Sequence, residues 1–141
     1  MGNSKLEIRM TNQIQNSKSE TGRTENDGDF DLEERTAVVG ENIIRLAKSV
    51  KSTATTMPLV NQLVRSGTSV GANYCEANDA ESRKDFRNKI ALCRKESHET
   101  KYWLRMLATA EPEAAEKARR LWQEAKELNL IFGSICRKTT K

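Results

Sequence analysis

Positively charged side chains recur in this chain at the spacing of an α-helix. Between Ser82 and Ala108 there are eight Lys or Arg residues and three acidic ones. Six basic residues are spaced by three, four or seven positions, and we call them the basic ridge: Arg83, Arg87, Arg94, His98, Lys101 and Arg105. On a helix these steps place side chains on one face, here predicted to be the solvent side. The ridge would extend over about 33 Å at 1.5 Å per residue.

Such a row of cations can bind phosphate groups. Duplex nucleic acid presents phosphates densely over this length, and contacts to its backbone do not depend on base sequence. The predicted nucleic-acid-binding residues are Arg83, Lys84, Arg87, Arg94, Lys95, His98, Lys101 and Arg105, with Lys89 also flanking the ridge. Two other interpretations stay open, namely an ordinary solvated helix face and a docking surface for an acidic protein. Trp103 and Phe86 fall on or near the buried side, so no stacking platform for single strands is expected.

A second group of polar residues shares helix faces with apolar ones. Ser66 and Asn73 lie on one stripe with Leu63 and Val70, and Glu96 and Glu99 recur with Leu92 and Trp103. Gly67 and Gly71, one turn apart, have no side chain to hold another backbone away. Buried polar groups need partners and can specify one packing over others. We therefore predict a structural polar network of Ser66, Asn73, Glu76, Glu96 and Glu99 that fixes helix register or subunit contacts.

No residue pattern indicates catalysis. A di-iron site in a helical bundle needs two Glu-x-x-His motifs, whereas the single His98 has a lysine three residues before it. His98 lies between Lys95 and Lys101 in the ridge, which favours a surface group over a general base. The three cysteines form no CxxC pair. We expect no enzyme, no metal, no cofactor and no small-molecule substrate. An enzyme acting through His98 and Glu99 is the least favoured reading.

The elements that carry these residues are helices. The apolar periods predict an all-α fold with four helices at about residues 32–53, 58–77, 82–108 and 112–137. Pro58 and Pro112 suit a first helical turn, Thr56 is a candidate cap, and Ser82 with Asp85 resembles a capping box. Short loops force neighbouring helices to be antiparallel. The chain is therefore predicted to form an up-down-up-down four-helix bundle over residues 31–141.

Residues 1–30 differ in composition from the rest. They are rich in Asn, Ser, Thr, Glu and Gly, which predicts a disordered tail. The tail holds four of the 24 basic and five of the 20 acidic residues, so the net positive charge belongs to the predicted bundle. No apolar run approaches the roughly 18 residues of a membrane span, and no signal peptide is evident. With three widely spaced cysteines, the expected compartment is a reducing cytoplasm.

Two stretches, SVGANYCEA and SRKDFRNKIALCRKESHETKYWLRML, make the chain resemble the four-helix family of 23S rRNA intervening-sequence proteins. That family has an S-[IV]-x-A-N-x-x-E segment, an S-[KR]-[KR]-[DE]-F helix start and an E-x-x-E-x-x-[YF]-W-L-like ending. The matching residues are Ser69, Val70, Ala72, Asn73 and Glu76, then Ser82, Arg83, Lys84, Asp85 and Phe86, then Glu96, Glu99, Tyr102, Trp103 and Leu104. The resemblance covers about residues 33–137. Many relatives have Gly where this chain has Ala77, so the helix break is expected at Asn78–Asp79.

The resemblance implies a small bacterial protein without an assigned activity. A related member, the accessory variability determinant of diversity-generating retroelements, is similar, and it forms a homopentamer that binds a reverse transcriptase and nucleic acid. By this likeness we expect a homo-oligomer, with a pentamer as one form, that binds nucleic acid, either RNA or DNA, with RNA favoured. The alternative is an adaptor that docks an acidic or enzymatic protein such as a reverse transcriptase.

Overall fold

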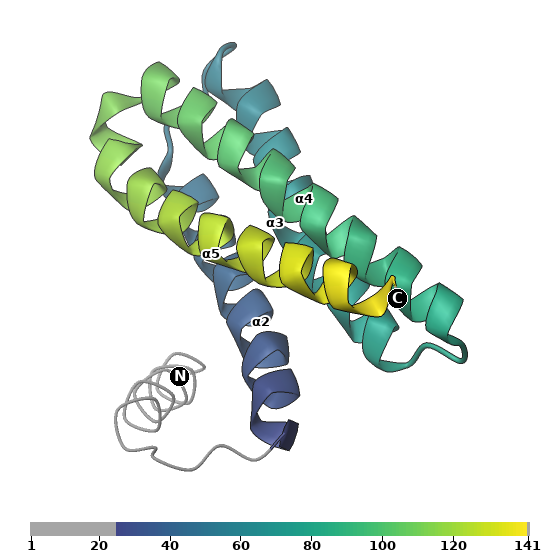
Figure 1. Ribbon diagram of the computed structural model, residues 1–141. Coiled ribbons are helices and arrows are strands. Elements are labelled where there is room, and N and C mark those ends of the chain that lie inside the picture. The colour runs from purple at the N-terminus through teal and green to yellow at the C-terminus, as the bar shows by residue number, and fades with distance from the viewer. Residues whose placement is uncertain (1–24, 141) are drawn as a thin grey trace, which may run out of the picture. The chain divides into compact units, whose positions relative to one another are not determined.

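The computed structural model describes residues 25–140, and these form helices joined by short connections (Figure 1). The elements are α2 (Glu25–Ser49), α3 (Thr56–Asn78), α4 (Arg83–Ala110), the short 3₁₀ helix η1 (Pro112–Ala114) and α5 (Ala115–Thr139). No strand occurs among the described residues. The predicted all-α, four-helix fold is confirmed.

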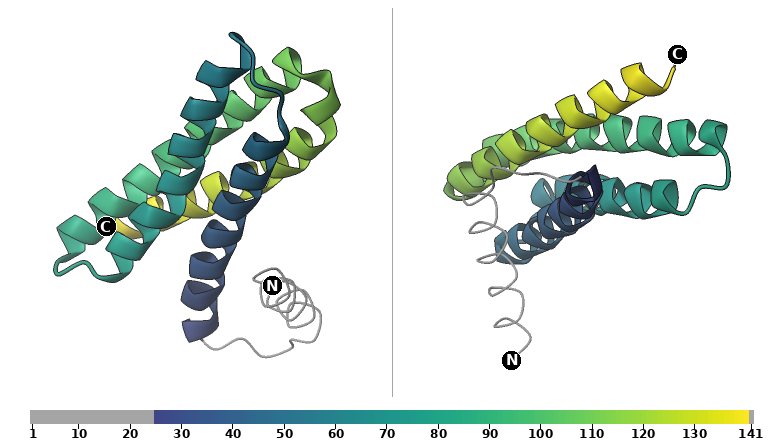
Figure 2. Two further views of the ribbon diagram at one scale, coloured as in Figure 1. Left: turned by 180° about the vertical axis from the view of Figure 1, so that it is seen from behind. Right: turned by 60° about the horizontal axis from the view of Figure 1, so that its bottom comes forward.

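Of the two units into which the chain divides, the second, Leu32–Lys141, contains the bundle. The chain reverses direction between successive helices, as in an up-down-up-down bundle (Figure 1). A second view shows α2 beside α3 and α4 beside α5 (Figure 2). Helix α4 packs against both α3 and α5, and α2 reaches α5 through Arg35, whose Nη2 lies 2.9 Å from Glu124 and 3.0 Å from Glu127. The central helix α4 thus presents one flank to α3 and another to α5.

The predicted apolar stripes form the core. Ile43 of α2, Leu63 of α3, Leu104 of α4, and Leu128 and Phe132 of α5 are all fully buried. Leu128 and Phe132 are four residues apart, which places them on one face of α5. Phe132 also packs against a second ring from α3, since its centroid lies 6.0 Å from that of Tyr74. Burial of these side chains supplies the main force that holds the helices together.

The first helix is displaced from its predicted bounds. It begins at Glu25, inside the predicted tail, and it ends at Ser49 rather than near Thr53. Residues 1–24 of the predicted tail lie outside the described residues. The early end has a local cause, because Thr53 and Thr56 each accept the backbone N–H of the other, at 3.0 and 2.9 Å, and the Thr56 hydroxyl lies 2.6 Å from the Lys51 carbonyl. These hydroxyl bonds offer the backbone an alternative to continuing the helix.

The other helix ends lie within a few residues of those predicted. Helix α3 begins at Thr56, with Thr55 at the N-cap position, so the prediction of Thr56 as the cap is wrong. Pro112 begins η1, and α5 follows from Ala115. Helix α3 ends at Asn78, where the break was expected. Helix α4 has Ser82 as its cap, and the Ser82 hydroxyl accepts the backbone N–H of Asp85 at 3.0 Å. This satisfies one of the free donors in the first turn. The cap therefore sets where α4 begins.

Helices α2 and α3 cross closely at the predicted glycines. A Cβ atom at Gly67 would overlap Cδ1 of Ile43, and one at Gly71 would lie 3.3 Å from Oγ1 of Thr36. On the α2 side, a Cβ at Gly40 would lie 3.7 Å from the Gly67 carbonyl oxygen. The missing side chains thus allow the two helices to approach each other.

Replacing Gly67 by alanine is expected to destabilise the bundle by about 1 kcal/mol. Overpacking costs about 1–3 kcal/mol, and the middle of this range, about 2 kcal/mol, exceeds by about 1 kcal/mol the gain of about 1 kcal/mol in helix propensity. Ile43→Val should cost about 0.5–1.5 kcal/mol in the wild type. In the Gly67→Ala background it removes the overlapping Cδ1 methyl, so there it should cost almost nothing. Urea unfolding of the four proteins measures this coupling, and additive costs would contradict the close packing of Gly67 on Ile43.

Candidate nucleic-acid interface

The basic ridge lies along the flank of α4 that borders α5. Its residues Arg83, Arg94, His98 and Arg105 are exposed, as are the neighbouring Lys84 and Lys95, whereas Arg87 and Lys101 are half-buried. Arg87 Nη1 donates to the Thr139 carbonyl at 3.2 Å, and Lys101 Nζ lies 5.6 Å from the centroid of the Trp122 ring. The prediction of a ridge wholly on the solvent side is therefore wrong for Arg87 and Lys101, since helix period alone does not tell how far α5 covers this flank.

Helix α5 adds positive charge to the same edge. Lys126 Nζ also lies 5.6 Å from the Trp122 ring centroid, and Arg137 reaches Gly133, which Arg94 approaches from α4. We call the combined surface the α4–α5 basic edge; it consists of Arg83, Arg87, Arg94, His98, Lys101 and Arg105 of α4 with Lys126 and Arg137 of α5. The α5 residues were missed because each helix was considered by itself. Lys126 lies four residues after Trp122, and Arg137 lies four residues after Gly133. This spacing could have indicated that the two basic residues share one face of the helix.

Lys89 does not flank this edge. Its Nζ lies 2.6 Å from a carboxylate oxygen of Glu76 on α3. The hydrogen bond and the negative charge of Glu76 raise the pKa of Lys89. Lys89 therefore belongs to the opposite flank of α4, and its charge is already paired.

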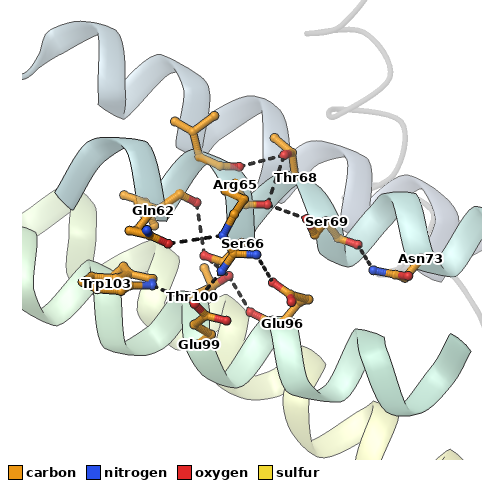
Figure 3. Close-up of polar contacts among 12 residues, drawn as sticks. Gln62, Arg65, Ser66, Thr68, Ser69, Asn73, Glu96, Glu99, Thr100 and Trp103 are labelled. Carbon is orange, nitrogen blue, oxygen red and sulfur yellow. Dashed lines mark hydrogen bonds and ion pairs between the residues drawn. The ribbon is translucent and has the colours of Figure 1, made fainter. Parts of the chain in front are cut away.

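On that opposite flank, Arg65 of α3 bridges two carboxylates of α4 (Figure 3). Its Nη1 donates to Glu96 at 3.2 Å and its Nη2 to Glu99 at 2.5 Å. Trp103 Nε1 donates to the same Glu99 oxygen at 3.2 Å. This hydrogen bond from Trp103, together with the hydrogen bond and the positive charge of Arg65, lowers the pKa of Glu99 despite its partial burial. The carboxylate of Glu99 is thus held in its ionised form.

A pair of buried hydroxyls lies beneath this ion cluster (Figure 3). Ser66 and Thr100 are almost completely buried, and their hydroxyl oxygens are 3.1 Å apart. Thr100 Oγ1 also lies 2.7 Å from the Glu96 carbonyl. Ser66, Glu96 and Glu99 of the predicted network therefore do lie together across α3 and α4, joined through Arg65 and Thr100, which the sequence did not single out.

The other two residues of the predicted network lie elsewhere. Asn73 is half-buried and donates to the carbonyl of Ser69 in its own helix at 2.9 Å. Glu76 is exposed and pairs with Lys89. Glu76 does meet α4, but it lies ten residues beyond Ser66, nearly three turns along α3, and Asn73 bonds only within its own helix, so neither joins the Arg65 cluster. The predicted single network is thus wrong for Asn73 and Glu76.

The cysteines and carboxylates do not gather into a site. Cys93 is buried, and burial raises the pKa of its thiol to about 12. Cys75 is exposed and Cys136 half-buried. Within residues 32–140 there is no group of three or more His, Cys, Asp and Glu side chains that could hold a metal ion. None of the described helices is long and apolar enough to cross a membrane.

Comparison with known proteins assigns this helical arrangement to a family. The model of the family described as 23S rRNA-intervening sequence protein matches residues 29–134. The chain belongs to this family. The match spans all of α3 and α4 and most of α5, so the Arg65 cluster and every residue of the basic edge except Arg137 lie within the family region of this intervening-sequence protein.

A solved structure supports the assignment. The chain is 33% identical to a protein of unknown function from the S23 ribosomal protein family of Bacteroides thetaiotaomicron VPI-5482, with a TM-score of 0.66. The similarity covers 74% of this chain and 97% of the solved one. No protein of curated function matches the chain.

Proposed function

We propose that this intervening-sequence protein is a non-catalytic protein that binds the phosphate backbone of nucleic acid, RNA in preference to DNA, through its α4–α5 basic edge. The observation that carries the proposal is the convergence of cations from two helices on one edge. Arg94, His98 and Arg105 of α4 and Lys126 and Arg137 of α5 all lie there. The family name, which refers to 23S ribosomal RNA, favours RNA as the ligand.

The distribution of paired acids also supports this edge. The ion pairs between the described helices lie elsewhere: Arg65 contacts Glu96 and Glu99, Lys89 contacts Glu76, and Arg35 contacts Glu124 and Glu127. No ion pair among the described residues includes Arg83, Arg94, Lys101, Arg105, Lys126 or Arg137. Their charge is therefore available to phosphate groups, whose binding releases counterions.

As part of the same proposal, the protein acts as a homo-oligomer, with a pentamer as one form. Two large apolar side chains on the surface support a contact between copies of the chain, because Leu130 is 62% exposed and Leu92 is 37% exposed. In an assembly of several copies the basic edges would act together, and avidity would strengthen weak individual contacts. Light scattering coupled to gel filtration measures the number of copies.

Binding to RNA is expected to weaken steeply with salt. We would measure the affinity of the full chain for a structured RNA and a duplex DNA of equal length between 50 and 200 mM salt. Each phosphate contact adds about −0.7 to −0.9 to the slope of log affinity against log salt, so a slope of about −3 or steeper would support the basic edge. A flat and weak response to both ligands would overturn the proposal and favour an adaptor that docks a protein such as a reverse transcriptase.

A further inference from the structure

Two arginines from different helices lie against the same glycine. A Cβ atom at Gly133 of α5 would lie 3.5 Å from Nη1 of Arg137 and 3.7 Å from Nε of Arg94. Gly133 itself is buried. Because Arg94 comes from α4 and Arg137 from α5, two guanidinium groups meet over a stretch of backbone that has no side chain to separate them.

Neither guanidinium is neutralised within the bundle. No ion pair among the described residues includes Arg94 or Arg137. Arg35, Arg65 and Arg120, by contrast, each contact a carboxylate. Two like charges held near one point repel each other, so this pair of arginines is a place where a bound anion would be favoured.

A third arginine lies further along the same gap between the helices. Asn129 of α5 donates to the carbonyl of Arg94 at 2.8 Å, and Arg87 donates to the carbonyl of Thr139. The two helices are antiparallel, and along α5 Arg137 lies between Asn129, which contacts Arg94, and Thr139, which contacts Arg87. The three arginines therefore follow one another along the edge, and two of them, Arg94 and Arg137, lie against Gly133.

We propose that Arg94 and Arg137, over Gly133, form a binding site for a phosphate monoester, which on a nucleic acid is the terminal phosphate of a strand. A phosphate monoester carries a charge of about −1.5 to −2 at pH 7 and three acceptor oxygens. Each guanidinium fork donates to two oxygens, so two forks can share three oxygens. An internal phosphodiester and a carboxylate each offer two charged oxygens and a single negative charge. Both charge and oxygen count therefore favour the strand end.

The choice of a nucleic acid as the carrier of this phosphate rests on the proposed function. The test uses the full chain and single-stranded RNA of one sequence, prepared with a phosphate or a hydroxyl at the 5′ end, and likewise at the 3′ end. The wild type is expected to bind one phosphorylated form about tenfold more tightly than its hydroxyl counterpart, as charge-assisted hydrogen bonds allow. The preference should fall between pH 7.5 and 5.5, because the second pKa of the phosphate is about 6.

Matched variants locate the site. Arg137→Lys keeps the charge but loses the fork, so the ratio of the two affinities should fall towards one. Arg120→Lys changes an exposed arginine of the same helix that pairs with Glu116, and it should keep the wild-type ratio. Gly133→Leu would fill the space between the guanidiniums and should also abolish the preference. Circular dichroism confirms that each variant is folded.

The outcomes separate this proposal from the proposed function. Equal affinity of the wild type for phosphate and hydroxyl ends, with steep salt dependence, would overturn the strand-end site and leave backbone binding intact. If RNA does not bind but inorganic phosphate raises the melting temperature of the wild type and not of Arg137→Lys, the phosphate site is supported and the nucleic-acid function is lost. If the protein binds neither RNA nor inorganic phosphate but does bind an acidic peptide, both proposals are overturned.

Discussion

Replacing Arg65 by alanine is expected to lower the free energy of unfolding by about 2 kcal/mol. Arg65 is the ion-pair partner of Glu96, whose side chain is only 10% exposed, so the variant leaves a carboxylate in the α3–α4 contact without its cation. Breaking a buried ion pair in this way costs about 3–5 kcal/mol. Arg65 itself is 46% exposed, and solvent reduces the loss, because exposed pairs contribute only about 0–1 kcal/mol. Urea unfolding at pH 7 measures the difference.

A matched variant and a second substitution define what the Arg65 result means. Arg120→Ala removes an arginine whose pair with Glu116 is 77% and 76% exposed, and it should cost less than about 0.5 kcal/mol. Adding Glu96→Gln to Arg65→Ala should recover part of the loss, since the unpaired charge is then absent. An equal cost for the two arginine variants would show that the cluster contributes no more than a surface pair.

The cost of Arg65→Ala should also depend on pH. In the folded protein the pKa of Glu99 is lowered from its ordinary value of 4.5, by the hydrogen bond from Trp103 and by Arg65. A carboxyl whose folded pKa is depressed stabilises the fold fully above its unfolded pKa, and this stabilisation is lost as the pH falls through the folded pKa. The difference between the wild type and Arg65→Ala should therefore be full at pH 7 and shrink below about pH 4.5. A constant difference over this range would place its origin in packing instead of charge.

The features that could be predicted from the sequence are those that a single helix determines. The buried positions of Leu63, Leu104 and Phe132 follow from apolar spacing, because a helix that packs on one side repeats every 3.6 residues. The start of α4 follows from Ser82 and Asp85, which are close in the sequence. The α2 end is local as well, but it depends on the hydroxyls of Thr53 and Thr56, and these do not interrupt the helical period.

Contacts between helices could not be predicted in the same way. Arg65 and Glu96 are 31 residues apart, and their pairing depends on how α3 and α4 are rotated against each other. The same rotation decides that Lys89 meets Glu76, whereas Arg94 meets Gly133 of α5. Periodicity places basic residues on a face of α4 but does not say which neighbouring helix borders that face. The contribution of Arg137 to the basic edge became visible only with the packing of α5.

Reversing two charges of the basic edge is expected to have the largest effect on ligand binding. Arg94 and Arg105 are exposed, and they are eleven residues apart, which places them three turns apart on the same face of α4. Arg94→Glu with Arg105→Glu replaces two cations that neutralise phosphates by two anions that repel them. We expect the affinity for RNA to fall by at least about tenfold at 0.1 M salt and the salt slope to become shallower by about 2. Arg87 is left unchanged because it holds the Thr139 carbonyl.

The control for this variant must change net charge equally without touching the edge. Lys117→Glu with Arg120→Glu meets this need, since both residues are exposed and lie seven positions before Glu124 and Glu127, on the α5 face that contacts α2 through Arg35. If RNA responded only to overall charge, the two double variants would lose affinity alike, and the assignment of the edge would be contradicted. A loss confined to Arg94→Glu with Arg105→Glu, with unchanged thermal stability, would place the phosphate contacts between α4 and α5. The position of the cations, rather than their number, would then explain how a helical bundle of modest net charge binds nucleic acid.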